Sequence, residues 1–415
     1  MKPTVFLPSR FWLCGALVAL VAGCGQSEPP QFHLNMVAVV KAQLPADQQQ
    51  DIANILDALF GTPDEPFVLP ETGLDLKKLL LAAGPVQSDE FGHETGLYRR
   101  HCGHCHGTTG DGLGPTAMLL NPYPRDYRQG KFKFKSTERP AKPTKADLEI
   151  VVRHGVPGTA MPSFALLPPA QVDALVEYVK YLSIRGEMEI RLIDAMADLS
   201  EGDKLPMARA NLVDEILKPV CEMWSTAAEA IIQPPVKPPI PPAESIAKGR
   251  ELFYGTKGNC AKCHVYSALG DGQTSDYDDW NKPINELAKD LTGEETRLQT
   301  DTDLTSDDKA VLRAHIGLVG SALRSDALPA RTATPRNLRQ GIYRGGRSPL
   351  DLYRRIYAGI NGMPMPAVGP ASQGAKGTME PDEIWTLVDY VLSLPYEPIS
   401  QPPRQQRSSV MQAKF

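Results

Sequence analysis

Apolar residues recur at helical spacing in several separate stretches of the chain. In residues 47–60 they fall at every third or fourth position, and Gly61 follows where the pattern stops. Residues 172–182, 384–394 and 212–217 repeat this spacing, the first two with aromatic residues among them. A period near 3.6 residues indicates helices that bury one face. The patterning therefore predicts an all-α protein.

Proline and polar residues divide these helical stretches into parts. Residues 233–242 are rich in proline and are expected to form a polyproline II strut, about 30 Å long at ~3.1 Å per residue. The strut predicts a boundary between two halves, preceded by a helical spacer at 184–233. Residues 398–415 are polar and are predicted to be a disordered tail.

The first residues have the pattern of an export signal. Lys2 and Arg10 precede an apolar run at 11–22, which leads to Cys24. The run is short for a membrane span. The sequence before Cys24 resembles a bacterial lipobox, in which residues 1–23 are removed and the cysteine is lipidated. We therefore expect an exported chain, lipid-anchored through Cys24 at the periplasmic face of a bacterial membrane. An uncleaved membrane anchor is the alternative.

Two short motifs hold four of the seven cysteines. Residues 102–106 read Cys-Gly-His-Cys-His, and residues 260–264 read Cys-Ala-Lys-Cys-His. C-x-x-C-H is the attachment signature of c-type haem. Two thiols on one helical turn reach the porphyrin from the same side, and the adjacent histidine supplies an iron ligand. The predicted residues are Cys102, Cys105, Cys260 and Cys263 for covalent attachment, and His106 and His264 for the iron.

A structural zinc site is the alternative use of two C-x-x-C pairs, but it leaves both histidines unexplained. The other cysteines offer no pair for a disulfide. Cys14 belongs to the expected signal, Cys24 is assigned to lipid, and Cys221 is expected to be a buried small residue. The net charge of −5, which becomes more negative without the signal, argues against nucleic acid as a partner.

The two cysteine motifs open two copies of one longer pattern. Each is followed by Gly-Asp-Gly, a Pro-Arg segment, a glycine-rich loop ending in Met-Pro, and an apolar helix with aromatic residues. Four landmarks in the same order indicate a duplicated module. The second copy also contains an acidic insert at about 272–334. The insert is expected to be a solvated face, with a docking surface for a basic partner as the alternative.

Each copy offers a second iron ligand in its Met-Pro loop. Met161 and Met365 occupy matching positions, in loops whose glycines let the backbone approach a flat porphyrin. A methionine sulfur as sixth ligand raises the potential of the iron and fills the position where oxygen or peroxide would bind. Met363 competes with Met365, but the repeat aligns it with Thr159. Core filling is the alternative role for both methionines.

Two arginines also occupy matching positions in the repeat. Arg125 and Arg336 are expected to pair with haem propionates, because a buried carboxylate requires donors and arginine offers a two-pronged one. A surface arginine is the alternative in each case. His101 and His104 flank the first motif and are expected to face solvent.

With these motifs in place, the chain resembles class I c-type cytochromes, duplicated. The resemblance implies two such domains, joined by a helical spacer and the proline-rich linker. In that family the first and last helices cross, which implies that Tyr98 meets Tyr178 and that Phe253 meets Trp385 and Tyr390. The expected organisation is a signal peptide at 1–23, a tether and N-terminal helical region at 24–87, the first cytochrome c domain at 88–183, the spacer and linker at 184–243, the second cytochrome c domain at 244–397, and the tail at 398–415.

The family also has a proline after the haem motif whose carbonyl accepts a hydrogen bond from the proximal histidine. Pro115 fits this role, whereas its counterpart by position, Ser275, does not. The second copy is therefore expected to depart from the family here.

The resemblance implies electron transfer through two covalently bound c haems, each with His and Met ligands. The expected partners are redox proteins or a membrane respiratory complex with a downstream acceptor. A six-coordinate iron does not bind substrate, so an electron carrier is favoured over an enzyme. The alternative is a di-haem enzyme, such as a cytochrome c peroxidase or a thiosulfate dehydrogenase, with one open iron site. Five lysines near the first motif are expected to steer an acidic partner or to add solubility: Lys131, Lys133, Lys135, Lys142 and Lys145.

Overall fold

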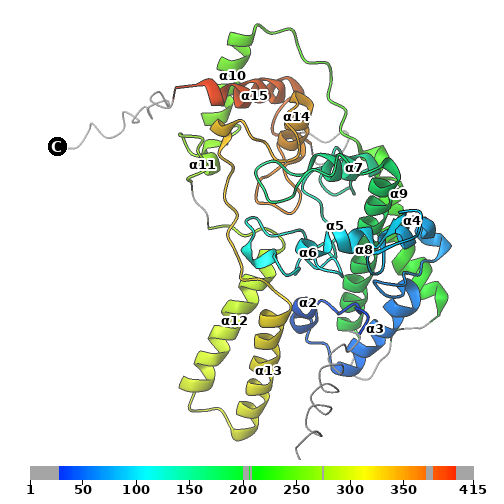
Figure 1. Cartoon of the computed structure of the whole chain (residues 1–415). Coiled ribbons are helices and arrows are strands. Elements are labelled where there is room, and N and C mark those ends of the chain that lie inside the picture. Colours follow the sequence, from blue (N-terminus) through cyan, green and yellow to red (C-terminus); the bar gives the residue numbers. More distant parts are fainter. Residues whose placement is uncertain (1–27, 200–204, 206–207, 273–274, 371–376, 399–415) are drawn as a thin grey trace, which may run out of the picture.

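The computed structural model describes residues 28–199, 205, 208–272, 275–370 and 377–398 (Figure 1). The expected signal, Cys24 and the predicted tail beyond residue 398 lie outside these residues. The described chain is mainly helical, which confirms the all-α prediction. Its two short strands, β1 (Gln87–Ser88) and β2 (Glu94–Thr95), form an antiparallel pair in which Gln87 faces Thr95.

The first half of the chain is built around the long helix α8 (Pro169–Ala197), which has a proline in its first turn. Packed on α8 are α3 (Ala46–Phe60), α4 (Leu76–Ala82), α5 (Leu97–His101) and α7 (Lys145–His154). The apolar stripe of α3 is buried as its spacing predicts, with Ile52, Leu56 and Phe60 fully inaccessible. Gly61 ends α3 with a φ of 68°.

Helix α8 continues without a break through residue 183, where the first module was expected to end. Its later residues Ile184, Met188 and Leu192 are buried in the same apolar cluster as α3. The π-helix η3 (Ala210–Leu217) and α9 (Lys218–Ser225) pack against α8. Cys221 lies in this cluster and is buried, as expected. The residues just after 183 therefore share the core of the first half.

The second half has its own apolar cluster, around α10 (Pro242–Tyr254), α14 (Pro349–Ala358) and α15 (Pro381–Ser393). α10 and α15 cross closely at Gly249, where a Cβ would lie 2.0 Å from the carbonyl oxygen of Thr386. This close approach requires glycine.

Tyr98 meets Tyr178 and Phe253 meets Tyr390 at the two helix crossings, as expected, whereas the ring partner of Trp385 is Tyr353 and not Phe253. The ring centroids of Tyr98 and Tyr178 are 4.9 Å apart, and those of Phe253 and Tyr390 are 5.4 Å apart. The ring of Trp385 packs on Tyr353 of α14, at 4.5 Å.

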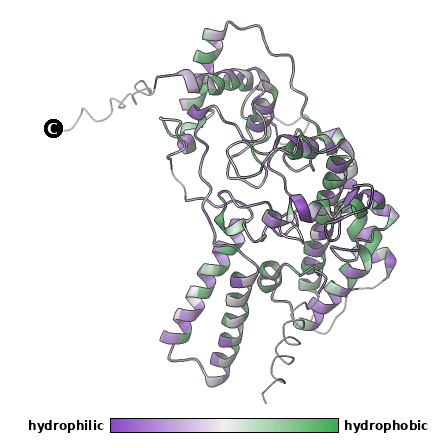
Figure 2. Cartoon of the chain, viewed as in Figure 1, coloured by the Kyte–Doolittle hydropathy of each residue, from purple (hydrophilic) through white to green (hydrophobic). Residues whose placement is uncertain are grey.

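The acidic insert contains a helical hairpin, which the sequence pattern did not predict. α12 (Asn281–Thr300) and α13 (Ser306–Ser325) pack on each other and, at one end, on α2 (Met36–Lys41). The hairpin projects from the rest of the molecule (Figure 1), and hydrophilic and hydrophobic residues are mixed along it (Figure 2). Thr305 and Asp308 form a capping box at the start of α13.

The proline-rich linker is held against the second half. The indole nitrogen of Trp385 donates to the carbonyl of Pro235 at 3.1 Å, and Lys237 pairs with Asp389 at 2.5 Å. Within the part of the chain that is described, no helix is both long and apolar enough to cross a membrane.

Candidate haem sites

The two cysteine motifs adopt the same local structure. In the first, Cys102 precedes the short helix α6 (Gly103–His106), and the amide of His106 donates to the carbonyl of Cys102 at 2.9 Å. In the second, α11 (Ala261–His264) follows Cys260, and the amide of His264 donates to its carbonyl, also at 2.9 Å. One helical turn thus brings each histidine to the cysteine that opens its motif. All four motif thiols are free.

Each motif histidine has a fixed hydrogen-bond partner on one ring nitrogen. Nδ1 of His106 donates to the carbonyl of Arg125 at 3.0 Å, and Nδ1 of His264 donates to the carbonyl of Arg336 at 3.3 Å. A carbonyl oxygen can only accept, so Nδ1 carries the proton and Nε2 keeps its lone pair for a metal.

The expectation that the Pro115 carbonyl accepts from His106 is wrong. The acceptor is Arg125, and the second half uses its counterpart Arg336. The two halves therefore do not differ at this point, because the acceptor belongs to a repeated segment and Ser275 is not needed for it.

Burial sets the protonation of the motif side chains. It lowers the pKa of His106 to about 4 and also lowers the pKa of His264, so both rings are neutral near pH 7. Burial also raises the pKa of the Cys102 thiol to about 12 and that of Cys260 to about 11. A neutral imidazole is the form that can ligate iron.

The two Met-Pro loops repeat each other closely. The amide of Val156 donates to the carbonyl of Met161 at 3.2 Å, and the amide of Ile360 donates to that of Met365 at 3.3 Å. The amides of Thr159 and Met363 then close matching turns, at 3.1 and 3.0 Å, onto the carbonyls of Val156 and Ile360 respectively. The structure thus aligns Met365 with Met161, and Met363 with Thr159, as the sequence repeat does.

The side chains of the two repeated arginines lie at the contact between the halves. The guanidinium of Arg125 stacks on the ring of Trp280, 3.4 Å from its centroid. Nε of Arg336 donates to the carbonyl of Ile342 at 3.2 Å. Sequence reasoning missed Trp280, although a tryptophan in an acidic insert is a signal of burial.

The five lysines near the first motif each bind a group of their own chain, and their expected role in partner steering or solubility stays a prediction. Lys131 pairs with Asp279 and Lys133 with Asp278, both from the acidic insert. The other three bind groups of the first half: Lys135 a set of carbonyls, Lys142 Glu187, and Lys145 Asp173. The insert thus faces basic residues of its own chain.

The flanking histidines behave differently from each other. His104 is exposed, as expected. His101 is half-buried against Phe164, with ring centroids 5.8 Å apart, and its Nε2 has no partner among the described residues. The solvent-facing prediction for His101 is wrong because the loop that contains Phe164 covers it.

The donor set suits haem c better than zinc. Each half presents two free thiols on a helical turn, a neutral imidazole with Nε2 available, and a methionine loop closed by glycine. In the part of the chain described, no group of three or more His, Cys, Asp or Glu side chains could hold a metal ion. The four motif cysteines are therefore not gathered into one such group.

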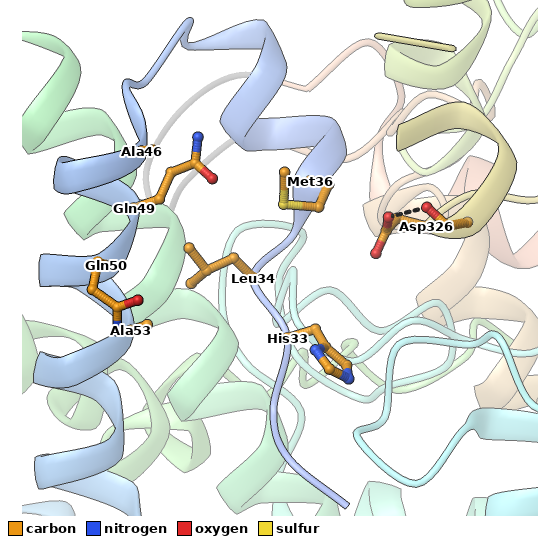
Figure 3. A pocket seen from close by; sticks show the side chains of 9 residues that line it. His33, Leu34, Met36, Ala46, Gln49, Gln50, Ala53 and Asp326 are labelled. Atoms are coloured by element: carbon orange, nitrogen blue, oxygen red, sulfur yellow. Dashed lines mark hydrogen bonds between the residues drawn. The ribbon is translucent and has the colours of Figure 1, made fainter. Parts of the chain in front are cut away.

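A shallow hollow of about 610 Å³ lies elsewhere, between α3 and the end of α13 (Figure 3). His33, Leu34 and Met36 line it together with Gln49 and Asp326. His33 is exposed. None of these residues belongs to the repeated motifs, so the hollow is not a candidate for haem.

A comparison with known protein families agrees with the first of these sites. A family profile described as cytochrome C oxidase, cbb3-type, subunit III, matches residues 93–179. A search of curated proteins gives no significant match. A chain of the Kuenenia stuttgartiensis reducing HAO-like protein complex Kustc0457/Kustc0458 is similar in structure, with a TM-score of 0.44 and 22% identity. That similarity covers 72% of this chain and 94% of the other. Residues 93–179 are therefore similar to a c-type cytochrome domain, a kind of domain that carries covalently bound haem c.

Proposed function

We propose that the chain is a di-haem electron-transfer protein. Haem c supplies an iron that cycles between its ferrous and ferric states. In this proposal Cys102 and Cys105 attach the first haem, and Cys260 and Cys263 attach the second. The iron ligands are His106 with Met161 and His264 with Met365.

The observation that carries the proposal is the agreement between the two halves in both ligand segments. Each motif histidine donates through Nδ1 to the carbonyl of a matching arginine, which leaves Nε2 for iron. Each Met loop closes through matching backbone hydrogen bonds. Residues that fill both axial positions exclude substrate, and they favour transfer of electrons over conversion of a molecule.

Arg125 and Arg336 remain proposed partners of the haem propionates. Burial lowers the pKa of Arg125 to about 10, which leaves it charged at physiological pH. The stacking of its guanidinium on Trp280 occupies a face of the group and leaves its edge free to donate. Two buried tyrosine hydroxyls, of Tyr98 and Tyr353, have no partner among the described residues and are further candidate donors.

We also propose that the chain is exported and anchored by lipid on Cys24, with redox proteins or a membrane respiratory complex as partners. The motif before Cys24 supports this, as does the use of cysteines for purposes other than disulfides. Replacement of the anchor by Cys24→Ser should release the protein from washed membranes. Retention of this variant in the membrane fraction would overturn the lipid assignment.

The ligand assignment is tested on the purified holoprotein. Mass spectrometry and the pyridine haemochrome spectrum should give two covalent haems per chain. The oxidised protein should show the sulfur-to-iron charge-transfer band of two methionine-ligated haems. Met161→His and Met365→His should each remove about half of that band. A high-spin haem in the wild type, or carbon monoxide binding to the reduced wild type, would contradict the proposal.

A further inference from the structure

The two Met-Pro loops are held from outside their own halves. Arg139, which belongs to the first half, donates to the loop of the second: Nη1 to the carbonyl of Met365 and Nη2 to that of Met363, both at 3.0 Å. The two carbonyls flank Pro364, which has no amide proton to donate. A planar guanidinium thus bridges the backbone on both sides of the turn that presents the Met365 sulfur.

The first Met-Pro loop is contacted in turn by arginines of the second half, although the hydrogen bond there is longer. Nη2 of Arg344 lies 3.4 Å from the carbonyl of Gly158, in the loop that leads to Met161. The guanidinium of Arg336 covers the same glycine, because a Cβ there would lie 2.4 Å from its Nη2. Each loop therefore has arginine from the other half against it.

Arg139 is itself held in a rigid loop. The ammonium of Lys135 donates to the carbonyls of Arg139 at 3.2 Å and Ala141 at 2.6 Å, and also to Glu138. The amide of Glu138 donates to the carbonyl of Ala230 at 2.9 Å, which ties the loop to the segment before the linker. A loop fixed at both ends positions the guanidinium without a large entropic cost.

The acidic insert supports the second Met loop from another side. The amide of Asp279 donates to the carbonyl of Gly362 at 3.0 Å, and a Cβ on Gly362 would lie 2.4 Å from the ring of Trp280. Gly158 and Gly362 are matching positions, both with a φ of 72°. The same point of each loop is therefore contacted by a residue distant in sequence.

We propose that Arg139 is a positioning residue for Met365, so that the sixth ligand of the second iron is fixed by the first half of the chain. This rests on the proposed ligation of iron by Met365. Without the arginine, the two carbonyls lose charge-assisted donors and the turn around Pro364 is freed. The sulfur then competes less well for the iron, because holding it in place costs more conformational entropy.

The test compares Arg139→Leu with Arg313→Leu in the holoprotein. Arg313 is exposed on α13 and serves as a matched loss of one arginine. Arg139→Leu should keep both covalent haems, lose up to about half of the methionine charge-transfer band, and lower the potential of one centre. Its reduced form should bind carbon monoxide at one centre. Arg313→Leu should match the wild type, and Arg139→Lys should fall between, since an ammonium is not a planar fork.

The outcomes distinguish a failure of the role proposed for Arg139 from a failure of the proposed function. Suppose that the wild type has two methionine-ligated haems. If Arg139→Leu then leaves the charge-transfer band, the potentials and carbon monoxide binding unchanged, only the role of Arg139 is overturned. A wild type without the two-haem methionine signature would instead remove the ligand assignment, and the inference with it. Circular dichroism with the haem count excludes simple misfolding of the variant.

Discussion

At the scale of single residues, the Met loops depend on glycines that no other residue can replace easily. Gly155 and Gly359 have φ values of 65° and 66°, in the left-handed region. A Cβ on Gly359 would also lie 2.6 Å from the carbonyl oxygen of Met365. Both backbone conformation and close contact therefore require glycine at this turn.

Gly359→Ala should lower the free energy of unfolding by about 1–3 kcal/mol, because the left-handed backbone and the contact with Met365 both oppose a side chain. Gly293→Ala is the control, since no atom lies within 4 Å of a Cβ at that position in α12. That change should leave stability unchanged or raise it by up to ~1 kcal/mol. Denaturant unfolding of the two variants measures the difference. Equal stability of the two would contradict the strained-turn argument.

The alignment of residues within one repeated segment could be predicted from the sequence. The alignment of Met161 with Met365, rather than with Met363, follows from local spacing, and the backbone hydrogen bonds reproduce it. The acceptor for His106 could not be predicted, because the carbonyl of Arg125 approaches it only after the chain folds back over 19 residues. The resemblance to class I cytochromes favoured the nearer Pro115.

At the scale of helices, Asp173 on α8 joins three elements. Its carboxylate pairs with Lys78 of α4 at 2.9 Å and with Lys145 of α7. Burial opposes its ionisation, but the hydrogen bonds from the two lysines outweigh burial and lower its pKa below the ordinary value of 3.8. The pairing therefore contributes to stability while Asp173 is ionised.

Asp173→Asn should lower the free energy of unfolding at pH 7 by about 1 kcal/mol. The folded-state pKa of Asp173 lies below the unfolded one. The stabilisation is thus present above pH 3.8 and is lost as the pH falls through the folded-state value. Urea unfolding of both proteins from pH 7 to pH 3 measures this. A deficit in the variant that stays constant down to the lowest pH would show that the charge is not the cause.

Helices with a continuous apolar stripe could be predicted from the sequence, whereas helices that bury few apolar residues could not. α3 buries Ile52 and Leu56 as its spacing requires. In contrast, α12 buries only Leu287, and α13 exposes Val311 and Leu318. A helix that buries only a narrow side has few apolar residues at helical spacing. The sequence therefore indicated the charge of the insert but not its two helices.

At the scale of the whole molecule, the two halves have separate apolar cores, one around α8 and one around α10 and α15. Much of the contact between them is polar and charged. Lys133 pairs with Asp278 at 3.1 Å, with both side chains largely buried, and Arg139 binds carbonyls 224 and 226 residues away. Local sequence gives no signal for contacts of this range. The expectation for the lysines, partner steering or solubility, therefore did not include ion pairs within the chain.

Trp280 is the residue most central to this contact. It is 9% exposed, it stacks under Arg125, and its indole nitrogen donates to the carbonyl of Asp126 at 3.2 Å. Its ring also fills the space beside Gly362 in the second Met loop. Removal of the ring therefore takes away apolar contact, a hydrogen bond and a cation–π interaction at one point.

Trp280→Ala should reduce the coupling between the halves by about 3–5 kcal/mol, the usual cost of deleting a large buried ring. Because each half retains its own core, the variant should unfold in two calorimetric transitions, whereas the wild type should unfold in one. Val388→Ala, a change in the apolar cluster of the second half, should lower stability without splitting the transition. A single transition in Trp280→Ala would mean that the remaining ion pairs, Arg139 and the apolar contact of α2 with the hairpin suffice to couple the halves. The tryptophan would then not be the central element of their contact.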